Sequence, residues 1–327
     1  MIPELEFLLR DRDGIEGPPI VTLTVNPAVD ESTVVEEVVP DRKLRCADLR
    51  REPGGGGVNV ARSVHRLGGD GLAVFTCGGP AGKLLEELLE REGVRQHPVA
   101  IRGWTRQNFN VTERSTGRQF RFVHPGPRLA RTEWHSCLDA LRDFHPAPAY
   151  VVASGSLPPG VPTDFYARAA RVAKELGARF VLDASGEPLR LAAHEGVFLL
   201  KPSLREFAEL TGETSADEKT LGARGRALVR QGACQVLVLS LGSGGALWAS
   251  EKGSGRLAAP AVTVRSTVGA GDALVAGIVL SLTRGLALPE AVRYGVSAAA
   301  ACVMNPGTQL CLREDAERLY AQLPACA

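Results

Sequence analysis

The chain has little excess charge and few aromatic residues, and these two shortages exclude a class of partner. Its 38 Lys and Arg residues balance 37 Asp and Glu residues, so the formal net charge is only +1, and aromatic residues make up 5% of the sequence. A nucleic-acid binder needs a basic stripe or an aromatic stacking platform. We therefore expect no nucleic-acid partner, and any anionic ligand must be bound by a local group of residues.

Paired cysteines and long apolar runs are also missing. The seven cysteines are scattered, and no two are spaced C-x-x-C, which argues against a disulfide framework or a zinc site. The longest apolar run, residues 273–282, is far below the roughly 20 residues that a membrane span needs. Residues 1–19 lack the pattern of a signal peptide. We expect a cytoplasmic protein with no membrane partner.

Short apolar runs alternate with helical patterns along most of the chain. Runs of strand length occupy residues 20–25, 73–76, 150–154, 180–183, 197–200 and 235–240. Helical patterns cover residues 58–67, 83–92, 163–176, 270–284, 289–303 and 313–323. Near-continuous apolar strands are typical of a buried parallel sheet. We predict an α/β fold, a doubly wound three-layer αβα domain.

Two stretches interrupt this alternation. Residues 108–123 alternate apolar and polar side chains around a break at 115–117, as a hairpin does, and residues 32–39 and 44–51 form a second such pair. We predict that these four strands make a small sheet that projects as a lid. The predicted division is an extension at 1–19, a main α/β domain at 20–31, 52–103 and 124–327, and a lid at 32–51 and 104–123.

The most informative segment is the turn STVGAGDA at residues 266–273, which opens an apolar helical stretch. Gly269 and Gly271 let the backbone approach a ligand, and a helix N-terminus offers unpaired N–H groups to a phosphate. Asp272 would place a base in this anion cradle. Taken alone, the carboxylate is better explained as helix capping, which contributes roughly 0.3–1 kcal/mol. The functional interpretation therefore depends on the other segments.

A second glycine cluster, residues 54–57, precedes Asn59. Four consecutive glycines cost conformational entropy, which favours a ligand-binding loop over the alternative of a flexible hinge. Asn59 offers both a donor and an acceptor to hydroxyl groups. Asp30 follows the strand at 20–25, near the carboxyl end where α/β proteins bind ligands. Asp30 and Asn59 together supply what a polyol binder needs.

Motifs of other enzyme classes are absent. Residues 78–84, GGPAGKL, look like a Walker A loop, but Cys77 stands at the position of its first glycine and Leu84 at that of its Ser/Thr. The sequence has no G-x-S-x-G elbow, no H-E-x-x-H pair and no strand-linked G-x-G-x-x-G, and its six histidines are isolated. Hydrolase, metalloprotease and dehydrogenase functions lose their support.

Together, these segments resemble the ribokinase-like, PfkB-type carbohydrate kinase family from about residue 20 onward. The resemblance is carried by GGGGVNVAR at 54–62, SGSLPPG at 154–160, KP at 201–202, SLG at 240–242 and TVGAGD at 267–272. Within the family, the chain is most similar to the 6-phosphofructokinases of this fold. That similarity is carried by KLRC at 43–46, WTRQN at 104–108 and RFVHPG at 121–126.

The resemblance implies transfer of the ATP γ-phosphoryl group to the 1-hydroxyl of fructose 6-phosphate, with Mg²⁺ required. Asp272 is then the general base, and the N–H groups of Gly269, Ala270 and Gly271 form the anion hole. The resemblance also implies a homodimer formed through the lids. The implied sugar-phosphate ligands are Asp30, Lys43, Gly55, Gly56, Asn59, Arg106 and Ser156. The implied nucleotide ligands are Lys201, Ser203, Ser240, Gly242, Thr267, Gly269 and Asn305.

Some of these positions also have a simpler interpretation. Lys43 and Arg106, taken singly, are equally well explained as solvated surface charges, and Lys201 as an ordinary lysine at a strand end. The predicted position of Lys43 and Arg106 in the lid is what favours binding for these two residues.

Three positions depart from that pattern. Ser203 replaces an asparagine that, in the family, helps to organise the water shell of the metal and phosphates. Glu206, which the resemblance implies lies near metal-bound water, is retained. Ala273 stands where a serine is common. Gln309 stands where the subgroup often has an arginine near a monovalent-cation site, so a need for K⁺ is left open.

Two alternatives to this function are also considered. One keeps the chemistry but uses fructose 1-phosphate or tagatose 6-phosphate as the acceptor. The other is a catalytically inactive sensor of a sugar phosphate or nucleotide. Asp272 argues against the sensor, because an aspartate beside a phosphate repels it unless a metal or proton transfer requires the carboxylate.

Overall fold

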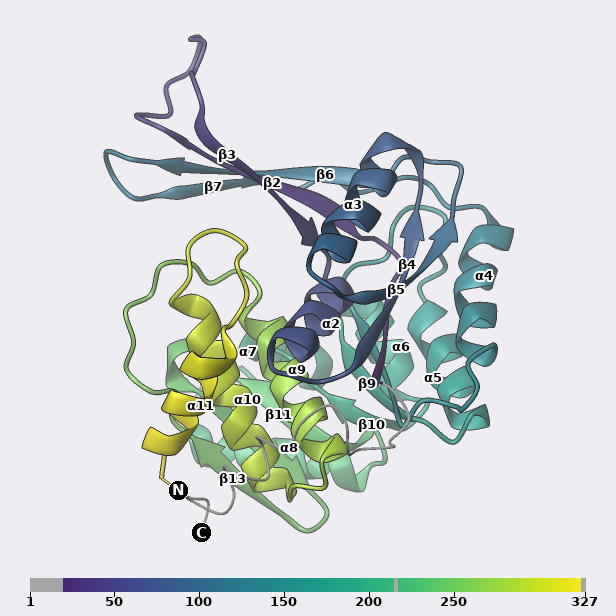
Figure 1. Ribbon diagram of the computed structural model, residues 1–327. Helices are drawn as coiled ribbons and strands as arrows, with labels where there is room; N and C mark the ends of the chain where they lie inside the picture. The colour runs from purple at the N-terminus through teal and green to yellow at the C-terminus, as the bar shows by residue number, and fades with distance from the viewer. Residues whose placement is uncertain (1–19, 215–216, 325–327) are drawn as a thin grey trace.

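The computed structural model describes residues 20–214 and 217–324, which form two sheets and the helices around them (Figure 1). The larger sheet has nine strands in the order β13-β12-β11-β10-β9-β8-β1-β4-β5, and the smaller has four in the order β3-β2-β6-β7. The predicted α/β class is confirmed. The predicted extension at 1–19 lies outside the described residues.

The large sheet is parallel except at one edge. Its parallel strands are β1 (Ile20–Thr24), β4 (Gly71–Cys77), β5 (Arg95–Ala100), β8 (Tyr150–Ser154), β9 (Arg179–Asp183), β10 (Val197–Leu200) and β11 (Cys234–Ser240). The antiparallel edge consists of β12 (Ala246–Ser250) and β13 (Gly253–Leu257). β1 and β8 are buried along their whole length, as expected of parallel strands that are covered on both faces.

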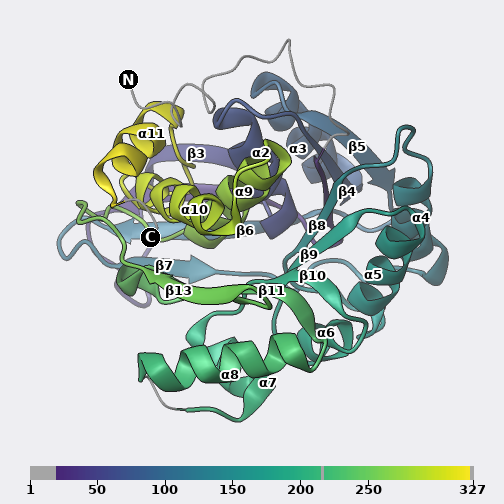
Figure 2. The ribbon, with the colours of Figure 1, turned by 90° about the horizontal axis from the view of Figure 1, so that it is seen from below.

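Helices cover both faces of this sheet (Figure 2). One face carries α2 (Gly56–Arg66), α9 (Ala270–Thr283), α10 (Leu288–Val303) and α11 (Arg313–Gln322), which share a hydrophobic core with it. The other carries α4 (Arg131–Arg142), α5 (Phe165–Glu175), α6 (Gly186–Ala193), α7 (Leu204–Thr211) and α8 (Glu218–Arg230) around a second core. The three-layer arrangement predicted from the sequence is therefore present.

The small sheet consists of β2 (Ala28–Val35), β3 (Ala47–Gly54), β6 (Arg106–Glu113) and β7 (Gln119–Phe122). The turn between β6 and β7 lies at the predicted break. The predicted strands at 32–39 and 44–51 differ from the structure: β2 begins earlier, at Ala28, and residues 36–46, which include parts of both predicted strands, form no strand. β2 pairs with β6 in parallel, which joins the two pairs into one sheet. Helix α3 (Gly79–Arg91) packs against β2 and β3.

The glycine run at 54–57 joins β3 of the small sheet to helix α2, beside Asp30 and Ser154. A Cβ atom added to Gly54 would lie 2.4 Å from Asp30 Oδ2, and one added to Gly56 would lie 2.1 Å from Ser154 Oγ. Close packing against site residues therefore requires glycine at both positions, which explains the run better than a flexible hinge does.

Candidate active site

Helix α9 begins with an open row of backbone N–H groups. Gly269 adopts a left-handed conformation (φ 77°, ψ −3°) that turns the chain into the helix, and only glycine accepts it without cost. The first helical hydrogen bond runs from Ala273 N to Gly269 O at 2.8 Å. The preceding N–H groups have no partner within the helix, and the helix dipole adds positive potential there, so this end suits an anion.

Asp272 lies in the first turn of α9, where two neighbouring segments hold its carboxylate. Asn59 Nδ2 of α2 donates to Asp272 Oδ2 at 3.0 Å, and Ser154 Oγ at the end of β8 donates to Oδ1 at 3.4 Å. Desolvation and the negative charge of Asp183 raise the pKa of Asp272 to about 7, against the opposing effects of Asn59 and Lys201. A carboxyl group that titrates near neutral pH is suited to general-base catalysis.

Lys201 and Asp183 form an ion pair beside the anion site, with Lys201 Nζ 3.1 Å from Asp183 Oδ1. Burial disfavours the Lys201 cation, but the charges of Asp183, Asp272 and Glu206 outweigh it and raise the pKa of Lys201. A Cβ atom at Gly271 would lie 3.4 Å from Lys201 Nζ. The ammonium group therefore stands next to the open N–H groups of α9, where it adds to the positive potential.

A cavity of about 530 Å³ opens on one side of this helix end. Its polar part includes the predicted nucleotide residues Ser240, Gly242 and Thr267, together with Ala270 and Gly271. The rest of its lining is mostly apolar and includes Pro260, Val262, Leu274, Val296 and Val303. A mostly apolar cavity with a few polar groups suits a nucleoside base, and the presence of Ala270 and Gly271 in its lining would bring attached phosphates to the helix N-terminus.

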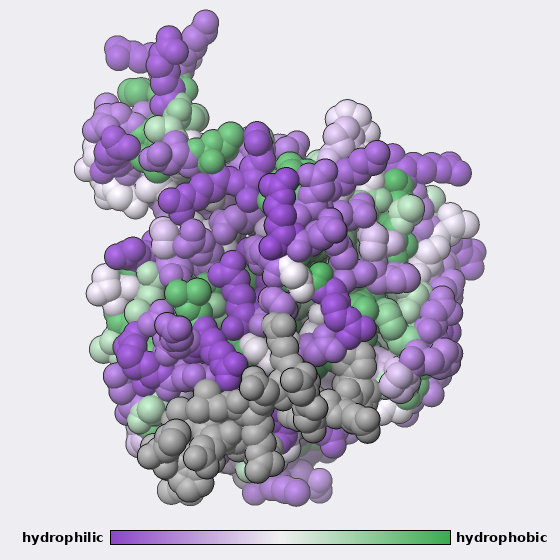
Figure 3. Space-filling model, viewed as in Figure 1, coloured by the Kyte–Doolittle hydropathy of each residue, from purple (hydrophilic) through white to green (hydrophobic). Residues whose placement is uncertain are grey.

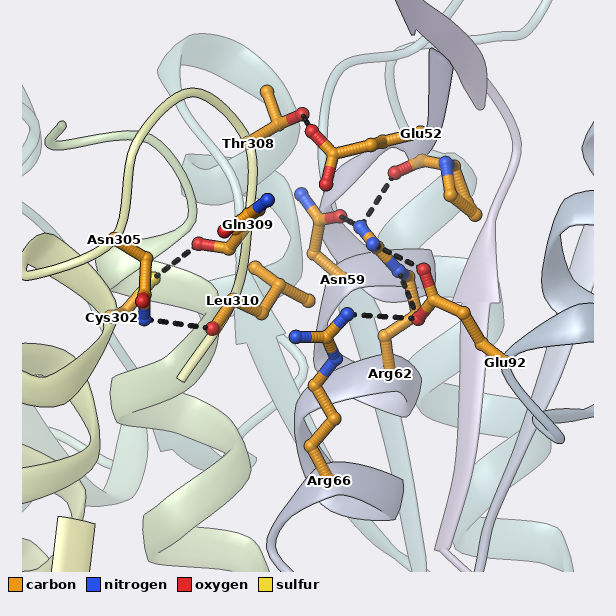
Figure 4. A network of polar contacts seen from close by, with 11 residues as sticks. Glu52, Asn59, Arg62, Arg66, Glu92, Cys302, Asn305, Thr308, Gln309 and Leu310 are labelled. Carbon is orange, nitrogen blue, oxygen red and sulfur yellow. Dashed lines mark hydrogen bonds and ion pairs between the residues drawn. The ribbon is translucent and has the colours of Figure 1, made fainter. Parts of the chain in front are cut away.

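Two predicted nucleotide residues have other roles in this chain. Asn305 Nδ2 donates to Ala301 O and Leu310 O, both at 3.1 Å, and so holds the loop after α10 (Figure 4). Ser203 caps α7: its hydroxyl accepts from Glu206 N at 3.3 Å, and Glu206 Oε2 accepts from Ser203 N at 2.7 Å. Neither residue lines the 530 Å³ cavity, so direct contact with the nucleotide stays a prediction for both.

A second cavity, of about 640 Å³, is lined by residues that directly follow Ser154. Its lining includes Arg106, His124, Gly155 and Ser156. Arg106 is anchored there, since its Nη1 donates to His124 O at 2.7 Å and its Nη2 to Asn26 O at 2.9 Å. The cavity thus combines a fixed cation with a hydroxyl group, which suits a phosphate.

Asp30 lies in the small sheet close to this cavity. Its Oδ1 accepts from Asn108 Nδ2 at 2.8 Å across the β2–β6 pair. Burial raises the pKa of Asp30, against the hydrogen bond from Asn108 and the charges of Arg106 and Arg121. The sequence motifs included Asn108 and Arg121 but assigned neither a role. The strand register places Asn108 opposite Asp30, and the charge of Arg121, which pairs with Asn110, acts on Asp30 as well.

Lys43 lies apart from the residues described above. It is exposed in the 36–46 connection between β2 and β3, which projects beyond the small sheet in Figure 1. Within a single chain, the predicted contact of Lys43 with the sugar phosphate stays untested.

The comparison with known families agrees with this geometry. A model of the pfkB family carbohydrate kinases matches residues 23–315. The chain belongs to this family. The kinase is 46% identical to ATP-dependent 6-phosphofructokinase isozyme 2 of Mycobacterium tuberculosis, over 93% of its own chain and 90% of that relative. It is 37% identical to the Escherichia coli isozyme 2, over 93% and 98%. A 1-phosphofructokinase of Xanthomonas campestris is 33% identical, over 80% and 83%.

Solved structures of Escherichia coli phosphofructokinase-2 have the same fold as the kinase. The complex with potassium has a TM-score of 0.90 at 37% identity, over 93% of this chain and 99% of that one. The complex with fructose 6-phosphate has a TM-score of 0.88 at 35% identity, over 94% and 99%. A tetrameric inhibited form has a TM-score of 0.88 at 36% identity, over 93% and 99%.

The described part of the kinase offers few side chains that could hold a metal ion unless substrate phosphates and waters also coordinate it. No cluster of three or more His, Cys, Asp or Glu side chains suited to a metal occurs among residues 20–214 and 217–324. Asp183 and Glu206 do lie near Lys201, as their effects on its pKa show. Mg²⁺ commonly keeps several waters and takes one or two carboxylates plus substrate phosphates. The donor set therefore fits a magnesium ion that arrives with its nucleotide.

Asp183 is the main site residue of the kinase that sequence reasoning missed. It was assigned to a strand, but its position as the last residue of β9, at the carboxyl edge of the parallel sheet, was the signal that could have identified it.

Two further observations concern the whole kinase. Where the chain is described, its six cysteines are all free. None of its helices within 20–214 and 217–324 combines the length and hydropathy that a membrane span requires.

Proposed function

We propose that this protein transfers the γ-phosphoryl group of ATP to the 1-hydroxyl of fructose 6-phosphate, giving fructose 1,6-bisphosphate and ADP. The observation that carries the proposal is the position of Asp272. Its carboxylate sits in the first turn of α9, whose Ala270 and Gly271 line the 530 Å³ cavity, and it is bonded to Ser154, which directly precedes Gly155 in the lining of the cavity that contains Arg106. This position of the base between the two cavities supports a transfer from a nucleotide in one cavity to a sugar phosphate in the other.

The mechanism follows from these positions. Asp272 accepts the proton of the 1-hydroxyl as its oxygen forms a bond to the γ-phosphorus. The bond between that phosphorus and the β–γ bridging oxygen breaks, and ADP leaves. The N–H groups of Gly269, Ala270 and Gly271, with Lys201 beside them, stabilise charge on the transferring group. Mg²⁺, when bound, neutralises phosphate charge, and Asp183 and Glu206 would hold it through water.

The 6-phosphate is the group that the Arg106 cavity would bind. The guanidinium of Arg106 and the hydroxyl of Ser156 line that cavity, while Asp30 and Asn59 would bind sugar hydroxyls. The proposal also rests on similarity, because the Escherichia coli relative was solved with fructose 6-phosphate and the 1-phosphofructokinase relative is more distant. Fructose 1-phosphate and tagatose 6-phosphate are the competing acceptors.

We extend the proposal to a homodimer that forms through the small sheet, which would act as a lid. Leu44, Leu49, Phe109, Phe122 and Val123 are exposed apolar residues in or beside this sheet. Figure 3 shows the sheet standing out from the body, with apolar groups among polar ones. Contact between two such sheets would bury these side chains. Lys43, at the exposed end of the same sheet, would then reach toward the site of the partner subunit.

The test is ADP release by the purified protein with MgATP and each of fructose 6-phosphate, fructose 1-phosphate and tagatose 6-phosphate. We expect the highest kcat/KM with fructose 6-phosphate. Asp272→Asn is expected to lower kcat by roughly 10²–10⁴-fold while sugar-phosphate affinity is largely kept, as for the loss of a general base.

Assays in KCl and in matched NaCl would establish whether K⁺ is needed for activity.

The outcomes separate the alternatives. A preference for another acceptor would keep the mechanism and change the substrate. Binding of the nucleotide and the sugar phosphate without turnover on any acceptor would favour the inactive sensor. Full activity in Asp272→Asn would overturn the role of the base.

A further inference from the structure

The amide of Asn59 must point in one direction to serve Asp272. Its NH₂ group donates to Asp272 Oδ2 at 3.0 Å. A carboxylate can only accept, so a rotation of the amide by half a turn would place the oxygen of Asn59 against the oxygen of Asp272. The orientation of this amide therefore decides whether the base is bonded or repelled.

The oxygen of that amide is held by Arg62, one turn further along α2. Arg62 Nη1 donates to Asn59 Oδ1 at 3.2 Å (Figure 4). A guanidinium can only donate. Between a donor on one side and an acceptor on the other, the Asn59 side chain has one satisfied orientation, with its NH₂ group toward Asp272.

The guanidinium of Arg62 is itself held in place by Glu92. Its Nη2 donates to Glu92 Oε1 at 2.6 Å and its Nε to Glu92 Oε2 at 2.9 Å, which makes a bidentate pair. Its side chain is fully buried, and Glu92 at the end of α3 is 22% exposed. Although burial opposes ionisation, the hydrogen bond and charge of Arg62 and the charge of Arg66 lower the pKa of Glu92. The carboxylate thus remains an acceptor.

The same guanidinium also anchors the glycine run. Arg62 Nη1 donates to Pro53 O at 2.8 Å, just before Gly54. One side chain therefore joins the loop that packs against Asp30, the amide that bonds Asp272, and the end of α3. A buried Arg–Glu pair usually adds little net stability compared with apolar packing, so stability alone does not explain this arrangement.

We propose that Arg62, locked by Glu92, is a positioning residue for phosphoryl transfer, which orients the amide of Asn59 so that its NH₂ group faces the carboxylate of Asp272. This inference rests on the proposed function of Asp272. Arg62 and Glu92 line neither the 530 Å³ nor the 640 Å³ cavity. Their effect on turnover would act through Asn59.

The first experiment compares Arg62→Lys and Glu92→Gln with the wild type. Lysine keeps the charge but lacks the fork that bonds Asn59, Pro53 and Glu92 together. We expect kcat to fall by about 10- to 100-fold, as for a lost orienting contact, with the KM for ATP within about threefold of the wild type. An unchanged kcat in Arg62→Lys would overturn the proposal.

Glu290→Gln is the matched control. Glu290 pairs with Arg293 at 2.6 Å, and the two side chains are 18% and 5% exposed, close to the values for Glu92 and Arg62. This pair joins α10 to α11, away from Asp272. We expect Glu290→Gln to lower Tm by a similar amount to Glu92→Gln and to leave kcat unchanged. Equal losses of kcat in the two variants would show a general effect of destabilisation and overturn the positioning role.

A double-mutant cycle tests whether Arg62 acts through Asn59. In an Asn59→Ala background there is no amide to orient, so Arg62→Lys should lower kcat by less than about twofold beyond Asn59→Ala alone. Independent, multiplied losses would contradict the route through Asn59. This cycle measures residual turnover with the best acceptor, whichever sugar phosphate that is.

A titration without substrate separates this inference from the proposed function. Asp272 faces the donors Asn59 and Ser154 and the charges of Asp183 and Lys201. Loss of the oriented donor raises its pKa, so the Asp272 carboxyl ¹³C signal, assigned through Asp272→Asn, should titrate at higher pH in Arg62→Lys. The same titration in both proteins would overturn the inference. A shifted titration in a protein that turns over no acceptor would keep the positioning and reject the proposed function.

Discussion

Ionisation of Asp272 destabilises the folded protein. The pKa of its carboxyl group is raised to about 7 in the folded state, compared with about 3.9 in an unfolded chain. A raised pKa means that the folded state binds the proton more tightly, so this contribution to stability is complete below about pH 4 and is lost as pH rises toward 7. At the scale of the residue, the site keeps a carboxylate at the expense of stability.

Asp272→Asn should therefore stabilise the protein in a pH-dependent way. The amide does not titrate, and it can accept from Asn59 and bond to Ser154. Relative to the wild type, we expect its free energy of unfolding to increase by about 1–3 kcal/mol between pH 5 and pH 8. Urea unfolding at the two pH values measures this difference. Asp139→Asn, an exposed site on α4, controls for loss of one charge, and a gap that is equal at both pH values would contradict the prediction.

Arg106 gives a second prediction at this scale. Its guanidinium is anchored to backbone carbonyls and lines the cavity proposed for the 6-phosphate. Arg106→Ala should raise the KM for the sugar phosphate by about 10- to 100-fold, the loss expected for a hydrogen bond to a charged group. The KM for ATP should change little. Arg102→Ala, at an exposed neighbour, is the control. An effect on kcat alone would contradict a binding role.

Motifs in the sequence predicted the residues of the site that lie in glycine-rich runs. Asp272 and Asn59 follow such runs, and the structure brings their side chains into contact. Asp183 and the Arg62–Glu92 pair were not predicted as parts of the site. Asp183 is a lone carboxylate at a strand end, and the pair joins residues 30 positions apart, a separation that local patterns do not encode.

At the scale of elements, the two ends of α9 offer a matched pair of glycines with which the proposed anion hole can be tested. Both ends of the helix carry a left-handed glycine, Gly269 with φ 77° before it and Gly285 with φ 83° after it. A Cβ atom at Gly269 would lie 2.6 Å from Leu310 Cδ2, whereas one at Gly285 would have no neighbour within 4 Å. The two positions share backbone strain and differ in packing and in distance from the site.

Gly285→Ala should cost about 1–2 kcal/mol of unfolding free energy, the price of left-handed backbone, with kcat unchanged. Gly269→Ala should cost about 1–3 kcal/mol more through overpacking. Its kcat should fall by about 10²-fold or more, because the N–H groups that follow would shift from the anion. Urea unfolding and steady-state kinetics measure both effects. Equal kinetics in the two variants would remove the anion-hole role of this turn.

Elements were predicted well where one periodicity dominates and poorly elsewhere. The predictions for α9, α10 and α11 each lie within one residue of the structure at both ends. By contrast, α8 was missed, because Gly222 and Gly225 weaken its helical pattern. Gly225 packs closely against the sheet, since a Cβ atom there would lie 2.8 Å from Leu237 Cδ2. β5 was missed because it is an edge strand with mostly polar or exposed residues.

At the scale of the whole molecule, the small sheet presents two different faces. One row of the strand register aligns Glu52, Asp30 and Asn108, and Asp30 and Asn108 are bonded to each other close to the cavity that contains Arg106. The next row aligns Glu31, Phe109 and Phe122. Because side chains alternate between the two faces of a sheet, the aromatic row lies on the face opposite to Asp30. This opposite face is the surface that we propose pairs with a second subunit.

The oligomeric state should therefore depend on Phe122. Its side chain is 54% exposed, and Phe122→Asp would place a charge in the proposed dimer contact at a cost of several kcal/mol. We expect a dimer for the wild type and a monomer for Phe122→Asp by light scattering at micromolar concentration. Leu312→Asp, at a site 49% exposed just before α11 and outside the small sheet, should remain dimeric. Loss of the dimer should also raise the KM for the sugar phosphate, since Lys43 of one subunit would no longer reach its partner. A dimeric Phe122→Asp, or a monomeric wild type with full activity, would rule out assembly through this sheet.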